Sequence, residues 1–273
     1  MLPQLLRIRI DQMTQRPRRA TLGPAGRPIG CRPDARRTHD SCHAPALRVH
    51  RMTTASAAVL AALRAGAALD DAAFDQLYPD AVRRLSIVHW TPVAVALRAA
   101  ALLAPIAGMR VLDVGAGAGK LCCVGAVVHA GTWHGIERDP ALVAAAAEIA
   151  RCLEVEHCTR FWAGDALTAS WRGYDSVYLY NPFESQRFGG GFARAAGGAG
   201  FAEQVAATEA RLAELLPGTR VVTFHGFGGE MPPGLALAEL EEIEGGELAL
   251  WIKRAGPGPY AAPGGRRARS RPR

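Results

Sequence analysis

The segment from Arg110 to Lys120 constrains this chain most, because it combines a short apolar strand, three closely spaced glycines and the start of a helix. It reads RVLDVGAGAGK, with an acid, Asp113, near the end of the strand. The three glycines are Gly115, Gly117 and Gly119. Glycine has no Cβ, so the backbone of such a turn can lie directly against a ligand. The segment therefore predicts a loop that binds a nucleotide-like ligand.

After this loop, apolar strands alternate with helices of ten to fifteen residues. The predicted strands are Arg110–Val114, Thr132–Glu137, Thr159–Ala163, Ser176–Tyr180 and Arg220–Phe224. The predicted helices are Lys120–His129, Pro140–Cys152 and Ala202–Leu216. This alternation indicates βαβ units, and hence a mostly parallel sheet with helices on both faces.

The C-terminal part changes pattern. Two strand-like runs, Leu235–Ile243 and Glu247–Lys253, flank the pair Gly245-Gly246 without a helix between them, which predicts a hairpin. The expected fold is therefore α/β: a doubly wound, mostly parallel seven-stranded sheet that ends in an antiparallel hairpin.

The positive charge of the chain lies in its two ends. The chain has a formal net charge of +7, but residues 1–51 alone hold eleven arginines against three aspartates. Residues 266–273 add five arginines, which leaves residues 52–265 acidic. Arginine-rich ends can contact nucleic acid, yet a Pro/Gly/Arg-rich composition cannot bury a core. We therefore expect a disordered extension over residues 1–51 and a disordered basic tail over residues 255–273; Met52 could itself start a shorter functional chain.

Residues 52–105 predict a helical cap that precedes the domain of residues 106–254. The run from Thr53 to about Leu69 is helical in composition, and a further helix is expected over Val93–Leu103. Thr91 followed by Pro92 is a helix-entry signal, with Thr as N-cap and Pro at the first helical position.

The six cysteines predict neither a disulfide framework nor a metal site. Cys122 and Cys123 are adjacent on the helix after the glycine loop, where packing is their expected role. Cys152 and Cys158 are further apart than the usual zinc-binding pair, and no second pair follows. The longest run without acidic or basic residues, Leu121–Ile136, contains two histidines and three glycines and does not predict a membrane span. We expect a cytoplasmic protein with no membrane partner.

Three kinds of glycine loop compete at residues 113–120. A P-loop is excluded, because its first glycine would fall on Val114 and Leu121 replaces its Ser or Thr. A dinucleotide loop matches at the first two glycines, but Lys120 occupies the third small position. Glu137 would suit the ribose-binding acid of such a site, so a nicotinamide-dependent oxidoreductase stays open as an alternative.

The third kind matches at several strand ends. Asp113-Val-Gly-Ala-Gly-Ala-Gly119 resembles motif I of class I S-adenosylmethionine-dependent methyltransferases, in which an acid stands two residues before G-x-G-x-G. Gly135-Ile-Glu137 resembles the family's second-strand motif, and Gly164-Asp165-Ala166 resembles the motif after its third strand. The resemblance covers about Trp90 to Arg254. It implies a Rossmann-like fold, S-adenosyl-L-methionine as cofactor and methyl transfer as the reaction.

The resemblance also implies roles for single residues. Asp113 would orient the amino-acid end of the cofactor, Glu137 would bind both ribose hydroxyls, and Asp165 would bind the adenine amino group. A Thr-Pro motif near the methionine end corresponds to Thr91. The implied cofactor-binding residues are Thr91, Asp113, Gly115, Gly117, Gly119, Glu137, Asp165 and Ala166. Each acid also has a structural interpretation, such as an N-cap for Asp165.

Asn181-Pro182-Phe183 follows the fourth strand, where the family places its catalytic residues. Amino-group methyltransferases carry Asn/Asp-Pro-Pro-aromatic there, and this chain lacks one of the two prolines. The hypothesis is methylation of a nitrogen in nucleic acid or protein, with the acceptor itself, including a small molecule, left open. The alternative from another class is a non-catalytic S-adenosylmethionine-binding module or partner subunit.

Overall fold

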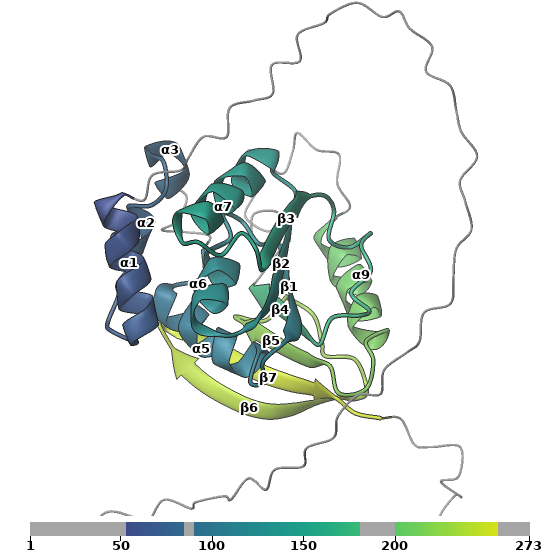
Figure 1. Ribbon diagram of the computed structural model, residues 1–273. Helices are drawn as coiled ribbons and strands as arrows, with labels where there is room; N and C mark the ends of the chain where they lie inside the picture. The colour runs from purple at the N-terminus through teal and green to yellow at the C-terminus, as the bar shows by residue number, and fades with distance from the viewer. Residues whose placement is uncertain (1–52, 85–89, 181–199, 256–273) are drawn as a thin grey trace, which may run out of the picture. The chain divides into compact units, whose positions relative to one another are not determined.

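The computed structural model describes residues 53–84, 90–180 and 200–255, all of which belong to one compact unit (Figure 1). The expected disordered ends, residues 1–51 and most of 255–273, lie outside the described residues. None of the described helices is both long enough and apolar enough to cross a membrane.

A seven-stranded sheet with the strand order β3-β2-β1-β4-β5-β7-β6 forms the centre of the unit. Its strands are β1 (Met109–Val114), β2 (Gly131–Glu137), β3 (Thr159–Ala163), β4 (Ser176–Tyr180), β5 (Arg220–Phe224), β6 (Leu235–Ile243) and β7 (Gly246–Lys253). Strands β1 to β5 pair in parallel, whereas β7 is antiparallel to both β5 and β6. The predicted α/β sheet and its terminal hairpin are confirmed.

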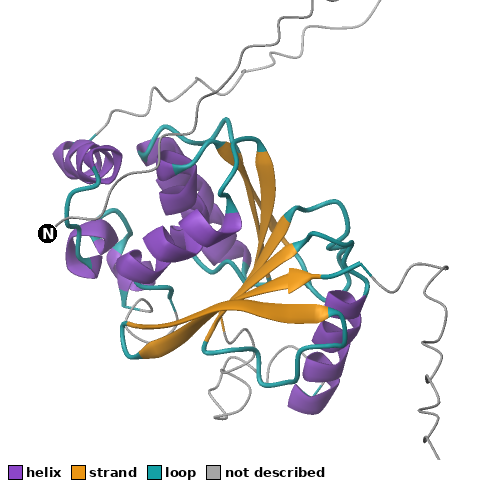
Figure 2. Ribbon diagram, turned by 90° about the horizontal axis from the view of Figure 1, so that it is seen from below, coloured by secondary structure: helices purple, strands orange, loops and turns teal. Residues whose placement is uncertain are grey.

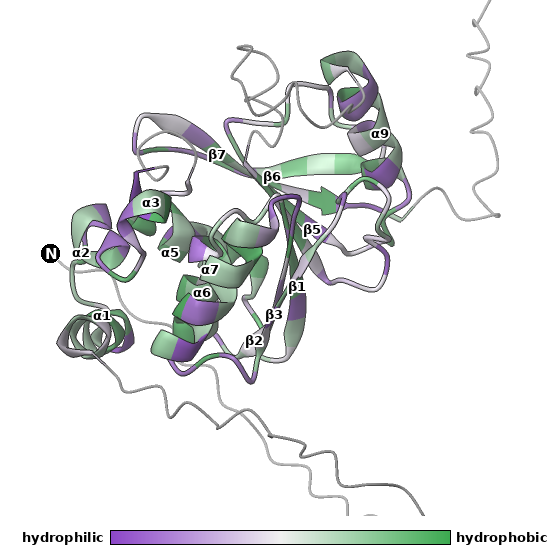
Figure 3. Ribbon diagram, turned by 90° about the horizontal axis from the view of Figure 1, so that it is seen from above, coloured by the Kyte–Doolittle hydropathy of each residue, from purple (hydrophilic) through white to green (hydrophobic). Residues whose placement is uncertain are grey.

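Helices cover both faces of this sheet. Helices α5 (Val93–Leu103), α6 (Lys120–Val128) and α7 (Pro140–Cys152) pack on one face, and α9 (Phe201–Ala213) lies on the other (Figures 1 and 2). Each face has its own cluster of buried apolar side chains. In Figure 3, α9 carries both hydrophilic and hydrophobic segments, as expected for a helix with one face on a sheet. Helix α9 ends before the predicted Leu216 because Pro217 disfavours helical backbone at the residue before it.

The N-terminal helices are short. Helix α1 (Thr54–Ala65) begins with a capping box between Thr53 and Ser56 and ends at Gly66. Gly66 has a left-handed φ of 61°, which ends the helix before the expected Leu69. Helices α2 (Asp71–Asp75) and α3 (Asp80–Arg83) follow, and α2 contacts α1.

The hairpin at the end of the sheet is fixed to α5. The guanidinium of Arg98 on α5 pairs with Glu239 and Glu241 of β6, and its Nε lies 2.6 Å from the Glu241 carboxylate. Arg98 thus links α5 to the edge strand β6, whose register is set by its backbone pairing with β7.

Candidate functional site

The glycine loop connects β1 to α6 at the carboxyl edge of the sheet. Its three glycines, Gly115, Gly117 and Gly119, have φ values of 78°, 52° and 78°, a left-handed region that favours glycine. A Cβ on Gly119 would also lie 2.7 Å from the Cβ of Ala146 and 2.9 Å from the ring of Phe161. The backbone N–H groups of Gly115 and Ala116 donate to the carbonyl of Ile136, which joins the loop to β2.

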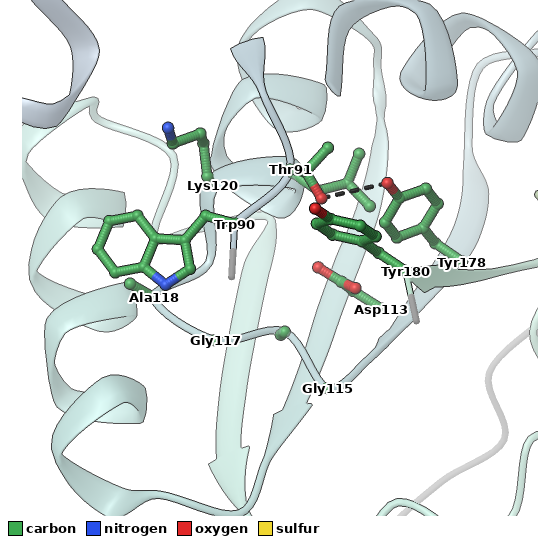
Figure 4. Close-up of a pocket in the computed structure, with 11 residues that line it drawn as sticks. Trp90, Thr91, Asp113, Gly115, Gly117, Ala118, Lys120, Tyr178 and Tyr180 are labelled. Carbon is green, nitrogen blue, oxygen red and sulfur yellow. Dashed lines mark hydrogen bonds between the residues drawn. The ribbon is translucent and has the colours of Figure 1, made fainter. Parts of the chain in front are cut away.

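A hollow of about 350 Å³, including its open mouth, lies along this loop. Figure 4 shows Trp90 at one end and Thr91, Asp113, Tyr178 and Tyr180 gathered at the other. The Trp90 ring lies 3.7 Å from the position that a Cβ of Gly117 would take, so a larger residue there would narrow the hollow. The remaining lining residues come from the loop and the first turn of α6: Gly115, Ala116, Gly117, Ala118, Lys120 and Leu121.

Asp113 supplies a buried acid to this hollow. It lies on β1 directly beside Tyr178 of β4, with only 4% of its surface exposed. Burial raises the pKa of its carboxyl to about 7, and the charge of Glu137 adds to the increase. The Cys122 thiol, 3.7 Å from Oδ2, opposes the increase by hydrogen bonding. A positively charged ligand group placed here would restore the ionised form of the carboxyl.

Thr91 also faces the hollow, but it is not the predicted N-cap of α5. Helix α5 begins at Val93 with Pro92 at the cap position, and no side chain of that cap bonds to the helix. The N–H of Val93 instead donates to Oδ1 of Asp71, at 3.1 Å. The Thr91 hydroxyl lies 3.1 Å from the Tyr178 hydroxyl, so the side chain is directed into the site and not back onto its own helix.

Glu137 ends β2 and is held by backbone donors. Its Oε2 accepts a hydrogen bond from the N–H of Gly117 at 3.0 Å, and its Oε1 accepts from Arg138 and Asp139. A carboxylate has about four acceptor positions. Three of these positions are occupied, so one is left for a ligand hydroxyl. A second ligand hydroxyl could bind only if it replaced the Gly117 N–H. Glu137 thus also fixes the glycine loop, a role that the sequence did not indicate.

Asp165 and Ala166 lie at the same sheet edge, just beyond β3. The N–H of Gly164 donates to the carbonyl of Glu137, which keeps the two strand ends together. Asp165 accepts from the N–H of Leu167 at 2.9 Å and lies 3.4 Å from the Arg138 guanidinium. Residues 166–168 form a turn and not a helix, so the interpretation of Asp165 as a helix N-cap is wrong. Neither Asp165 nor Ala166 lines the hollow, and both are separated from Asp113 by the width of β2.

Residues 106–183 match a protein family described as "Methyltransferase domain". This match spans β1, the glycine loop, Glu137 and Asp165, and so includes the strand-end acids just described. No curated protein matches the chain. Residues 106–183 therefore form a methyltransferase domain. The oxidoreductase alternative has no comparable support.

Solved methyltransferase structures are also similar to this chain. One is an RNA methyltransferase from Salinibacter ruber in complex with S-adenosyl-L-homocysteine, with 24% identity, a TM-score of 0.47, and coverage of 62% of this chain and 95% of that chain. TrmN from Thermus thermophilus has 22% identity and a TM-score of 0.48, and the match covers 63% of this chain but 52% of TrmN. A SAM-dependent methyltransferase from Thiobacillus denitrificans, also with S-adenosyl-L-homocysteine, has 28% identity and a TM-score of 0.37, with 54% and 55% covered.

The predicted catalytic residues of the methyltransferase, Asn181, Pro182 and Phe183, lie outside the described residues. The structure describes β4 up to Tyr180, whose ring lies 5.0 Å from that of Phe224 and 5.9 Å from that of His225, between centroids. The strand end that carries the catalytic motif in the family therefore enters an aromatic cluster at the carboxyl ends of β4 and β5.

Two aromatic residues of the methyltransferase site, Tyr178 and Tyr180, were not predicted from the sequence. They alternate along β4, so both point to the face that carries Asp113. A Tyr-x-Tyr pattern at the end of a central strand was the available signal. The contacts of Lys120 with α2 were also missed, because they join positions about fifty residues apart.

Proposed function

We propose that this methyltransferase domain uses S-adenosyl-L-methionine as methyl donor and transfers the methyl group to a nitrogen in nucleic acid or protein. The observation that carries the donor assignment is the carboxyl group of Asp113. In the part of the chain that the structure describes, no Lys, Arg or His forms an ion pair with it, although it is almost fully buried. The donor carries an ammonium group on its amino-acid end, which would supply the missing cation.

The rest of the hollow fits such a donor. Gly115 and Gly117 leave backbone exposed where a side chain would fill the space in front of Trp90. Thr91 and Tyr178 place two hydroxyl groups beside Asp113 as further polar contacts for an amino-acid moiety. Glu137, on the next strand, has acceptor capacity for a ribose hydroxyl. Thr91 precedes α5, Tyr178 lies on β4, and Glu137 ends β2 without lining the hollow, so an extended ligand would run across the glycine loop between them.

When bound, the donor supplies a methyl group on a positively charged sulfur, which is activated for in-line displacement. The protein has little covalent chemistry to perform: it aligns the acceptor and accommodates the proton that the acceptor loses. Trp90 and the glycine loop would exclude water from one side of the hollow. Tyr180, the last residue of β4, lines the hollow and also contacts Phe224 at the end of β5, so we place the entry of the acceptor on this side.

The nitrogen acceptor is supported by the sequence after β4. An Asn side chain offers an oxygen that accepts from an NH2 group, and an aromatic ring offers a surface on which a planar group stacks. Asn181 and Phe183 supply both residue types within three positions, although the motif is one proline shorter than in the amino-group methyltransferases that it resembles.

Replacement of Glu137 tests the donor site. We expect Glu137→Ala to weaken S-adenosylhomocysteine binding by roughly 1.5–3 kcal/mol, the scale of hydrogen bonds to a charged group. The loss has two sources, because both the ribose contact and the bond that holds the Gly117 N–H are removed. Isothermal titration calorimetry measures this, with Glu137→Gln as the matched control that keeps an oxygen acceptor. Unchanged affinity in Glu137→Ala would place the ribose elsewhere.

Replacement of Asn181 tests catalysis separately from binding. We expect Asn181→Ala to leave S-adenosylhomocysteine affinity within about twofold while methyl transfer falls by about 100-fold or more, as when a group that acts in the transition state is lost. Tritium transfer from labelled donor into fractionated lysate supplies the assay and identifies the acceptor class. Transfer at the wild-type rate would make Asn181 a structural residue. Wild-type binding of S-adenosylhomocysteine with no transfer into any fraction would favour the non-catalytic alternative.

A further inference from the structure

Lys120 is a buried cation at an unfavourable position. It is the first residue of α6 and directly follows the glycine loop, and only 3% of its side chain is exposed. The N-terminus of a helix carries a partial positive charge, so a cation there is unfavourable unless anions offset it. A small uncharged residue at this position would let the helix follow the loop without that electrostatic cost. The side chain therefore needs an explanation beyond packing.

Two carboxylates of α2 provide the offset. The Lys120 ammonium lies 2.7 Å from Oδ1 of Asp71 and 2.7 Å from Oδ1 of Asp75. It also lies 5.5 Å from the centre of the Phe74 ring and 5.7 Å from that of the Trp90 ring, within the range of cation–π attraction. Figure 4 shows this side chain leaving the glycine loop in the direction opposite to Asp113. Lys120 therefore extends from the glycine loop into the N-terminal helices.

Further contacts join the region of α2 to the glycine loop and to α5. Oδ1 of Asp71 also accepts the hydrogen bond from Val93, so a single carboxylate caps α5 and binds Lys120. The hydroxyl of Tyr78, which follows α2, donates to the carbonyl of Ala118 inside the glycine loop at 3.0 Å. The rings of Tyr78 and Trp90 lie 4.7 Å apart, between centroids. The region around α2 thus contacts the loop at two successive places, Ala118 and Lys120.

We propose that Lys120 is a positioning residue for donor binding: through Asp71 and Asp75 it fixes the glycine loop against α2 and makes the N-terminal helices part of the binding site. This inference depends on the proposed donor. Coupling between two sites is reciprocal. A ligand that requires the ordered loop therefore also stabilises α2 and α3, and loss of the Lys120 contacts weakens both effects.

The test compares four full-length proteins by calorimetry with S-adenosylhomocysteine. Lys120→Met removes the charge and is expected to weaken binding about tenfold or more, within the usual 5- to 150-fold range of such coupling. Lys120→Arg keeps the charge and should recover most of the affinity. Arg64→Met is the matched control, because it removes an exposed ion pair with Glu154 from the same group of helices, and it should bind like wild type.

A second readout separates positioning from simple loss of stability. Trypsin cleavage after Arg83, at the end of α3, is expected to slow when S-adenosylhomocysteine binds the wild-type protein, and to slow much less in Lys120→Met at ligand saturation. If Lys120→Met does not fold, Asp71→Asn replaces it. An Asn oxygen still accepts from Val93 while the charge is lost, and a loss of affinity of several-fold is expected.

The outcomes are distinct. Wild-type affinity and wild-type trypsin protection in Lys120→Met, or in Asp71→Asn where it replaces Lys120→Met, would overturn the inference, as would an equal loss of affinity in Arg64→Met. A wild-type protein that does not bind S-adenosylhomocysteine would instead overturn the proposed donor.

Discussion

Gly119→Ala is expected to lower the free energy of unfolding by roughly 2–5 kcal/mol and to abolish measurable donor binding. The left-handed φ of 78° costs a non-glycine residue about 1–2 kcal/mol. The new Cβ would also lie within 3.0 Å of Ala146 and of the Phe161 ring, and such overpacking typically costs about 1–3 kcal/mol. Relief of the clash requires α6 to move away from α7 and β3, which would displace the glycine loop.

Gly66→Ala provides the matched control for this prediction. Gly66 has a comparable φ of 61°, but nothing lies within 4 Å of the position of its Cβ. Gly66→Ala should therefore lower the free energy of unfolding only by the cost of the left-handed backbone, roughly 1–2 kcal/mol, and leave donor binding intact. Urea denaturation of both variants measures the difference. Equal destabilisation of the two variants would show that the contacts of a Cβ at Gly119 with Ala146 and Phe161 add no cost.

Asp113→Asn is expected to stabilise the ligand-free protein while weakening donor binding. Burial raises the pKa of Asp113 from 3.8 to about 7, so its ionised form destabilises the folded state by up to about 4 kcal/mol above pH 7. An Asn of the same size carries no charge and avoids this cost. The ammonium of the donor, however, loses its charged partner, which should reduce S-adenosylhomocysteine affinity by roughly 10- to 150-fold, equivalent to about 1.5–3 kcal/mol.

The pH dependence follows from the direction of this shift. Between about pH 4 and pH 7 the folded state binds more protons at Asp113 than the unfolded state does, so stability from this group falls as the pH rises through that range. Above about pH 7 both states are ionised and the contribution is constant. Donor affinity should change in the opposite direction and increase from about pH 6 to pH 8, because binding requires the ionised carboxylate.

Denaturation and calorimetry across this pH range check both parts. In Asp113→Asn the slope of stability between about pH 4 and pH 7 should be reduced relative to wild type, and the increase in affinity between about pH 6 and pH 8 should disappear. An identical pH profile in the two proteins would assign the titration to another group and remove the basis for the ammonium contact.

The sheet and the class of ligand loop were predictable because they depend on local pattern. Apolar runs that alternate with helical segments predicted the strands to within one or two residues of their observed bounds. In a parallel sheet the carboxyl ends of neighbouring strands share one edge, so Asp113, Glu137 and Asp165 were expected at the same edge of the sheet. Their assignment to one donor site, and the identity of the donor, came from the family resemblance of the motifs that carry them.

The contacts of these residues were not predictable in the same way. Thr91 has the sequence context of an N-cap, yet its hydroxyl contacts Tyr178 and the cap is supplied by Asp71. The residues that approach each other here are separated by more than twenty positions, and neither periodicity nor spacing specifies which of several polar side chains will meet. Packing of α2 against the loop decides the choice.

The stretch from Arg110 to Lys120 separates the features that depend on sequence alone from those that depend on tertiary structure. By itself the sequence determined that a strand, a glycine turn and a helix follow one another, because each glycine provides a backbone conformation that other residues avoid. Only the tertiary structure decided that Asp113 is buried with a pKa near 7 and that Lys120 is paired with Asp71 and Asp75. Burial and charge pairing depend on which distant elements cover a residue, and those elements come together only when the chain has folded.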